Sequence, residues 1–121
     1  MPENADGNKE DCIFHILNCF DLKFDVTIDD FQLAIDEFTS HMQNVGLVES
    51  MGAIGRRQRH PIMDTDSERD QEYFFILSFR DWDQCDRAVD FITPHNEPEE
   101  SIHNYVNSKI TNAIFICWED I

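Results

Sequence analysis

The segment EYFFILSF, residues 72–79, decides how this chain folds. It is too short for a stable helix of its own, and its aromatic and aliphatic side chains are typical of a buried β-strand. Successive side chains of a strand point to opposite faces, so Phe74 and Ile76 lie on the face opposite to Phe75. Both faces are apolar, and we therefore expect both faces to be covered.

Three further strands are predicted around this one. Residues 13–20 and residues 110–118 are also apolar on both faces. Residues 47–57 form a weaker strand, because Gly52 and Gly55 interrupt it and glycine within a strand often marks a bulge. A polar loop over residues 58–70 is too long for a tight hairpin and joins this strand to residues 72–79.

A helix is predicted between the first two strands. Thr27-Ile28-Asp29-Asp30 matches a capping box, in which a hydroxyl and a carboxylate bond the free N–H groups at a helix start. Apolar residues then recur at helical spacing, and Gly46 follows where a left-handed cap would end the helix. That apolar stripe consists of Phe31, Ala34, Ile35, Phe38, Met42 and Val45.

Two shorter helices are predicted between residues 72–79 and the last strand. Asp81 is suited to an N-cap, and Pro94 would end the helix that it begins. Pro98 is suited to the first turn of another helix, which would stop at Asn107 or Ser108.

The element order is therefore β-α-β-β-α-(α)-β, the split βαβ arrangement of ferredoxin-like α+β folds. We expect a four-stranded antiparallel sheet with the helices on one face. An antiparallel sheet with a free face normally shows one polar side, and this one shows none. A second copy would cover the remaining face, which predicts a face-to-face homodimer, a dimeric α+β barrel. Phe75 and Phe115 are predicted to contribute to that interface or to the core.

Length and charge limit the functions that the chain can have. Its 121 residues suit one domain, with residues 1–10 as a disordered tail and residues 11–121 as the folded part. The formal net charge of −16 argues against nucleic acid and against anionic membrane surfaces as partners. There is neither an apolar run that could span a membrane nor an apolar signal-peptide region near Met1.

The cysteines indicate a reducing compartment. Cys12, Cys19, Cys85 and Cys117 include no CxxC pair, and three of them lie in apolar runs, where free cysteine behaves as a small buried hydrophobe. We expect reduced thiols in a cytoplasmic protein, with a disulfide as the alternative.

Several short motifs resemble a known superfamily. They are Phe20-Asp21-Leu22-Lys23, Val106-Asn107-Ser108, Thr111-Asn112 and Phe115. On these residues the chain resembles the dimeric α+β barrel proteins, and within them a small bacterial group with no assigned activity. The resemblance implies a ferredoxin-like homodimer. Members include cofactor-independent monooxygenases of polyketide-like aromatics, haem-degrading enzymes and stress-responsive proteins, so the fold does not fix the function.

Four residues are candidates for binding a ligand. His15 and Asn112 are polar residues in apolar strands and could act as a base or bind a carbonyl, or they could be satisfied by neighbours. Arg56 begins a basic cluster over residues 56–59 that would suit an anionic ligand or pair with nearby acids. Trp118 could line a pocket mouth or pack at the interface. Asn18 needs partners for the same reason as Asn112.

The sequence contains no recognisable catalytic, cofactor or metal motif. His95 and His103 are too far apart for a metal-ligand pair, and we expect neither a metal nor a cofactor. We therefore favour a small-molecule-binding or structural homodimer, or a ligand sensor. The alternative is a cofactor-independent monooxygenase-like enzyme with a small apolar or aromatic substrate held between the sheet and the helices.

Overall fold

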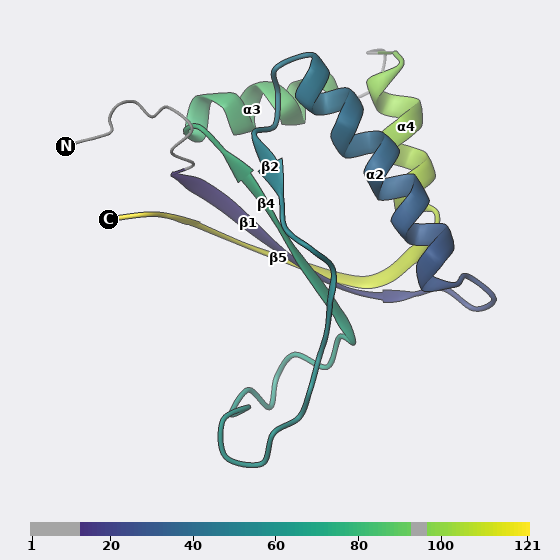
Figure 1. Ribbon diagram of the computed structural model, residues 1–121, viewed down its shortest axis with the longest axis vertical. Coiled ribbons are helices and arrows are strands. Elements are labelled where there is room, and N and C mark those ends of the chain that lie inside the picture. Colours follow the sequence, from purple (N-terminus) through teal and green to yellow (C-terminus); the bar gives the residue numbers. More distant parts are fainter. Residues whose placement is uncertain (1–12, 93–96) are drawn as a thin grey trace.

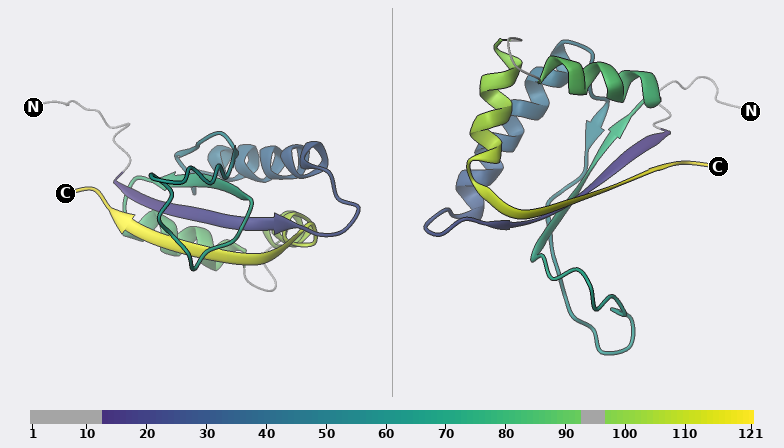
Figure 2. Two further views of the ribbon diagram at one scale, coloured as in Figure 1. Left: turned by 90° about the horizontal axis from the view of Figure 1, so that it is seen from below. Right: turned by 180° about the vertical axis from the view of Figure 1, so that it is seen from behind.

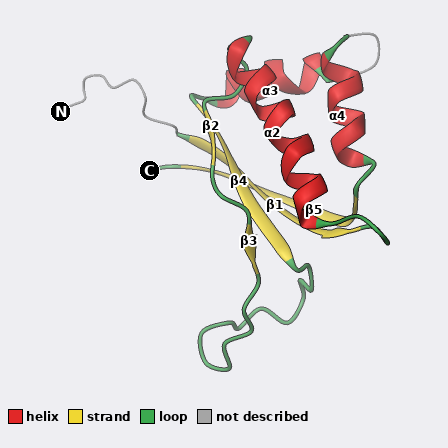
Figure 3. Ribbon diagram, turned by 45° about the vertical axis from the view of Figure 1, so that its right-hand side comes forward, coloured by secondary structure: helices red, strands yellow, loops and turns green. Residues whose placement is uncertain are grey.

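β1 (Phe14–Leu22) is the central strand of the sheet and pairs antiparallel with β4 (Tyr73–Phe79) and β5 (Ile110–Glu119). The computed structural model describes residues 13–92 and 97–121. The predicted tail and Pro94 therefore lie outside the described residues. The strand order is β2-β4-β1-β5, and α2, α3 and α4 all lie on one side of the sheet (Figures 1 and 3). The ferredoxin-like α+β prediction is confirmed.

The predicted strand over residues 47–57 is two short strands in the structure, β2 (Ser50–Met51) and β3 (Gly55–Arg56). Both pair with β4, so the described sheet has five strands rather than four. Met51 and Gly55 are four positions apart, whereas their partners Leu77 and Phe74 are three apart. One extra residue therefore bulges out between β2 and β3, at the glycines that marked a bulge in the sequence.

The helices begin where their capping residues predicted. In α2 (Ile28–Asn44) the Thr27 hydroxyl accepts a hydrogen bond from the Asp30 N–H at 3.1 Å, and Asp30 accepts one from the Thr27 N–H. In α3 (Trp82–Phe91) the Asp81 carboxylate accepts from the Gln84 N–H at 2.8 Å. α4 (Glu99–Asn107) ends at the predicted position.

Gln84 joins three segments of the fold through one buried side chain. It is fully buried, and its amide donates to the Gly46 carbonyl and to the Glu49 carboxylate at 3.0 and 2.9 Å. Its carbonyl oxygen accepts from the Arg80 N–H at 2.7 Å. The start of α3 is thereby fixed to the turn that follows α2, so every polar atom of this buried amide has a partner.

One face of the sheet is not covered by any helix of the described residues, and we call it the open face. Its side chains form three rows across β4, β1 and β5: Ser78, His15 and Trp118; Ile76, Leu17 and Ile116; Phe74, Cys19 and Ile114. Ile76, Ile114, Ile116 and Trp118 are 37–39% exposed. Phe75 and Phe115, which were predicted as interface or core residues, both point to the helix side, and Phe75 is a core residue there. The apolar second face is real, but it is formed by the alternate set of side chains.

The loop between β3 and β4, residues 57–72, projects beyond the end of the sheet on the side away from the helices, and we call it the arm (Figures 1 and 2). Arg57 organises it: its guanidinium donates to the Asp64 carboxylate at 2.7 and 2.6 Å and to the Asp66 carbonyl at 2.8 Å, and also bonds the Arg69 carbonyl. Ile62 and Met63 are about three-quarters exposed on the arm.

The arm predicts how stability responds to acid. Hydrogen bonds from Arg57 hold the pKa of Asp64 below its usual 3.8. When folding lowers the pKa of a carboxyl group, the ionised group stabilises the folded state at any pH above the pKa of the unfolded chain. That stabilisation is lost as the pH falls through the lower pKa of the folded state. Asp64→Asn should therefore lower the melting temperature at pH 7, and the gap to wild type should close as the pH falls below about 3.8. A gap that stays constant in thermal melts from pH 7 to pH 3 contradicts this account.

Candidate functional site

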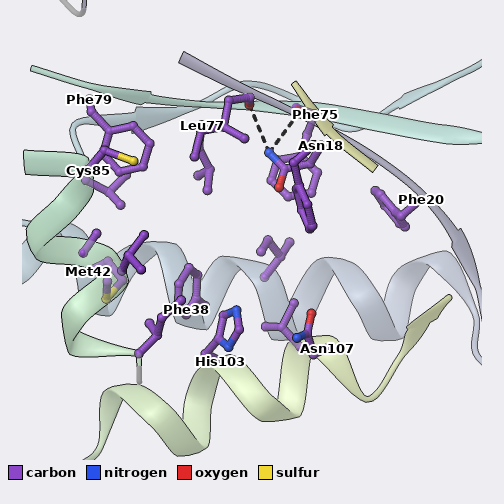
Figure 4. A pocket seen from close by; sticks show the side chains of 18 of the residues that line it. Asn18, Phe20, Phe38, Met42, Phe75, Leu77, Phe79, Cys85, His103 and Asn107 are labelled. Carbon is purple, nitrogen blue, oxygen red and sulfur yellow. Dashed lines mark hydrogen bonds between the residues drawn. The ribbon is translucent and has the colours of Figure 1, made fainter. Parts of the chain in front are cut away.

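A cavity of about 290 Å³ lies between the sheet and the helices. Its upper wall in Figure 4 comes from the strands and its lower wall from α2 and α4, and α3, with Cys85, lies at one end beside Phe79. The walls are almost wholly apolar. Phe75 on β4 and Phe38 on α2 contribute rings from opposite walls, and Phe115 and Cys117 contribute from β5. The lining residues that the structure describes include no Asp, Glu, Lys or Arg.

Asn18 is the polar group of the sheet wall, and it is only 8% exposed. Its Nδ2 donates to the main-chain carbonyls of Ile16 and Phe75 at 3.0 and 3.4 Å. These two acceptors decide the orientation of the amide, because an oxygen in the same place would face two other oxygens. Oδ1 therefore points into the cavity, as Figure 4 shows.

His103 and Asn107 lie one helical turn apart on α4, across the cavity from Asn18 (Figure 4). The His103 ring packs near the Phe38 ring, with 5.7 Å between their centroids. Burial lowers the pKa of His103 below its usual 6.5, so the ring is neutral at pH 7. A neutral imidazole has one donor and one acceptor nitrogen.

The described cysteines are all free thiols. Cys85 lines the cavity from α3, and burial raises its pKa to about 11, with Cys117 adding to the effect. Cys19 is 1% exposed, and burial raises its pKa as well. Both therefore stay protonated and unreactive at neutral pH. Cys117 is exposed rather than buried as predicted, because β5 is an edge strand, and Cys12 lies outside the described residues.

The structure brings His15 and Trp118 together, but on the open face rather than at the cavity. The centroids of their rings are 5.1 Å apart. His15 Nδ1 bonds the Ser78 hydroxyl at 2.8 Å, and His15 Nε2 bonds Asp120 Oδ1 at 3.0 Å. These hydrogen bonds connect Ser78 on β4, His15 on β1 and Asp120 just after β5. Both ring nitrogens of His15 therefore have partners within the protein, so the open face can be covered without leaving the imidazole unpaired.

Asn112 lies apart from the cavity and fastens the arm to the sheet. Its φ of +56° is left-handed, a conformation that asparagine tolerates better than most residues. The side-chain amide of Asn112 donates hydrogen bonds to the carboxylates of Asp21 and Asp70 at 2.9 and 3.0 Å. The main-chain carbonyl of Asn112 accepts a hydrogen bond from the Gln71 side chain at 2.8 Å. The register between β1 and β5 shifts at this point, between Cys19 and Asp21.

The arginine cluster is engaged with acids and with an aromatic ring. Arg56 forms an ion pair with Glu72 at 3.3 Å and lies over the Tyr73 ring, 5.5 Å from its centroid. Arg57 pairs with Asp64 at 2.6 Å. Neither arginine lines the cavity. Within the described ranges, no group of three or more His, Cys, Asp or Glu is placed to hold a metal ion.

Sequence reasoning missed two polar groups of the cavity, His103 and Asn107. The signal for them was present: they are four positions apart in a short helix, beside the apolar stripe of Ile102 and Val106. Asn18 was recognised as a polar residue that needs partners, and the structure supplies partners for its nitrogen.

None of the helices within residues 13–92 and 97–121 combines the length and the apolar character that crossing a membrane requires.

Several solved structures share the fold at low sequence identity. The protein At3g17210 from Arabidopsis thaliana aligns with a TM-score of 0.64 and 10% identity, over 90% of this chain and 95% of its own. SnoaB, a cofactor-independent oxygenase from Streptomyces nogalater, aligns with a TM-score of 0.54 and 12% identity, over 92% and 95%. A dimeric ferredoxin-like protein of unknown function from Bacteroides fragilis NCTC 9343 aligns with a TM-score of 0.51 and 11% identity, over 89% and 96%. At such identities the likeness concerns the fold alone.

Sequence comparison is more specific about the family. No curated protein matches this chain. A family model does match it from residue 13 to residue 120, which is nearly the whole of the described chain. The chain therefore belongs to the Family of unknown function (DUF6614).

Proposed function

We propose that this protein is a homodimer that binds a small apolar molecule in the cavity between the sheet and the helices. The observation that carries the proposal is the cavity itself, about 290 Å³ with almost wholly apolar walls. An engineered apolar cavity of about 150 Å³ stays dry and binds benzene. The present cavity is larger, and it suits a molecule of about two fused rings.

The open face supports the homodimer. Ile76, Ile116 and Trp118 expose a contiguous apolar surface, and soluble monomers rarely leave such a surface uncovered. The arm projects on the same side and carries Ile62 and Met63 exposed, so it is placed to extend the contact with a second copy. A structural neighbour from Bacteroides fragilis is dimeric. The free thiols also support the predicted cytoplasmic location.

Filling the cavity with a larger side chain should weaken ligand binding. Ala88 lies on α3, is 6% exposed and lines the cavity. Ala88→Phe should weaken the binding of 2-naphthol by a factor of about 100, because the added ring occupies the space of the ligand. Titration calorimetry measures the loss.

Ala53→Phe is the matched control, since Ala53 is exposed and outside the cavity. It should bind 2-naphthol as wild type does. Equal binding by wild type and Ala88→Phe would place the ligand elsewhere. Native mass spectrometry of the purified protein reports the dimer and any retained ligand together.

Cofactor-independent oxygenation is the second candidate function. The fold matches that of SnoaB, and the neutral His103 ring at the cavity could accept a proton from an activated substrate carbon. Dioxygen would be the oxidant, converting a CH₂ group and O₂ into a carbonyl group and water. The test is oxygen uptake with a two-ring compound that carries an activated CH₂ group, such as 2-indanone. Uptake that is lost in His103→Phe would support this function, and uptake at the uncatalysed rate would contradict it.

A further inference from the structure

The sheet wall of the cavity presents a hydrogen-bond acceptor, Asn18 Oδ1, to a ligand. Asn18 is more than nine-tenths buried, and both of its recorded hydrogen bonds are made by Nδ2. Among the described residues no donor reaches Oδ1, which points into the cavity (Figure 4). The apolar walls around Oδ1 offer it no donor, so a ligand that brings a donor to Oδ1 gains a hydrogen bond that a ligand without one does not.

We infer, resting on the proposed function, that the ligand is a neutral aromatic molecule of about two fused rings bearing a hydroxyl or N–H group, and that Asn18 Oδ1 accepts its hydrogen bond. The rings of Phe75 and Phe38 line opposite walls and suit a flat aromatic skeleton.

The charge of the ligand follows from the same lining. The described walls contain no charged side chain, and the whole chain carries −16, so an anion would be buried without a counter-charge. The arginines at positions 56 and 57 are paired with Glu72 and Asp64 outside the cavity. A neutral hydroxyl or N–H group therefore fits this site, whereas a carboxylate or a phosphate does not.

A matched ligand pair tests the inference in the wild-type protein. 2-Naphthol and 2-fluoronaphthalene have nearly the same shape, but only the former donates a hydrogen bond. Calorimetry should give a Kd for 2-naphthol that is about tenfold lower, since leaving Oδ1 unpaired costs the second ligand one hydrogen bond. Equal affinities would overturn the donor inference and leave the proposed function standing. Binding of neither compound would overturn the proposed function itself.

Variants assign the acceptor. Asn18→Leu keeps a similar shape and should reduce the tenfold preference to less than about twofold, while 2-fluoronaphthalene still binds. Asn44→Leu is the matched control, since Asn44 is exposed on α2 and outside the cavity, and it should keep the preference. A tenfold preference that persists in Asn18→Leu would overturn the assignment to Asn18. Circular dichroism shows whether each variant is folded. If Asn18→Leu does not fold, the two ligands measured with the wild-type protein still decide whether a hydrogen-bond donor is needed.

Discussion

Ile116→Asp is expected to convert the proposed dimer into a monomer. Ile116 lies in the middle row of the open face, beside Leu17 across the β1–β5 pair, and is 39% exposed. In a two-fold interface each copy contributes the same surface, so the substitution places two carboxylates in the apolar contact. Burying them without partners costs several kcal/mol each, which opposes association. Light scattering after size exclusion should show the mass fall from two chains to one chain of 14.2 kDa.

Leu33→Asp is the matched control for this prediction. Leu33 lies on α2, is 73% exposed and is on the helix side of the sheet, so the same charge change should leave the dimer intact. Circular dichroism separates dissociation from unfolding, and the milder Ile116→Thr should raise the dimer Kd while preserving the fold. A wild-type monomer, or a dimer that survives Ile116→Asp unchanged, would refute the interface on the open face.

Local features of the fold could be predicted from the sequence, because a few neighbouring residues determine them. The Thr27 and Asp81 caps each depend on a hydrogen bond to a residue three positions on, and both form. The bulge between β2 and β3 was indicated by Gly52 and Gly55. Such features do not require knowledge of distant parts of the chain.

The sequence did not determine which face of each strand packs against the helices. A shift of one residue moves every side chain of a strand to the other face, and here both faces are apolar, so the pattern does not say which set meets the helices. Phe75 is in the core, whereas its neighbours Phe74 and Ile76 are on the open face. For the same reason His15 could not be placed on the open face, nor Asn18 at the cavity, before the structure was known.

The cavity could be predicted only as a region between sheet and helices. Its volume and its polar groups depend on how far α3 and α4 stand from the strands, a tertiary property that no local motif encodes. His103 becomes a cavity residue because α4 packs along α2, which brings its ring to Phe38. The same packing bonds His41 to Glu99 at 2.7 Å and so ties the start of α4 to α2.

Phe20→Ala is expected to cause the largest loss of stability of any single truncation in the core. Phe20 is 1% exposed, and its ring centroid lies 4.6 Å from that of Phe31, 5.6 Å from that of Tyr73 and 5.8 Å from that of Phe75. The ring thus connects β1, β4 and α2. Removing it should lower the free energy of unfolding by about 3–5 kcal/mol, through lost apolar burial and the void left behind. Urea denaturation at a fixed protein concentration measures the loss, since the proposed dimerisation would make stability depend on concentration.

Phe24→Ala is the control for this prediction, because it removes the same kind of side chain from an exposed position. Phe24 is 94% exposed, four positions along the same chain segment, and its truncation should change the unfolding free energy by less than about 0.5 kcal/mol. Domains of this size are stable by about 5–15 kcal/mol, so Phe20→Ala removes a large share of the total and Phe24→Ala a negligible one. Similar losses in the two variants would mean that the aromatic cluster around Phe20 does not hold α2 against the sheet. Because Phe20 also lines the cavity, a stable Phe20→Ala protein would in addition have a larger cavity and accept larger ligands than wild type.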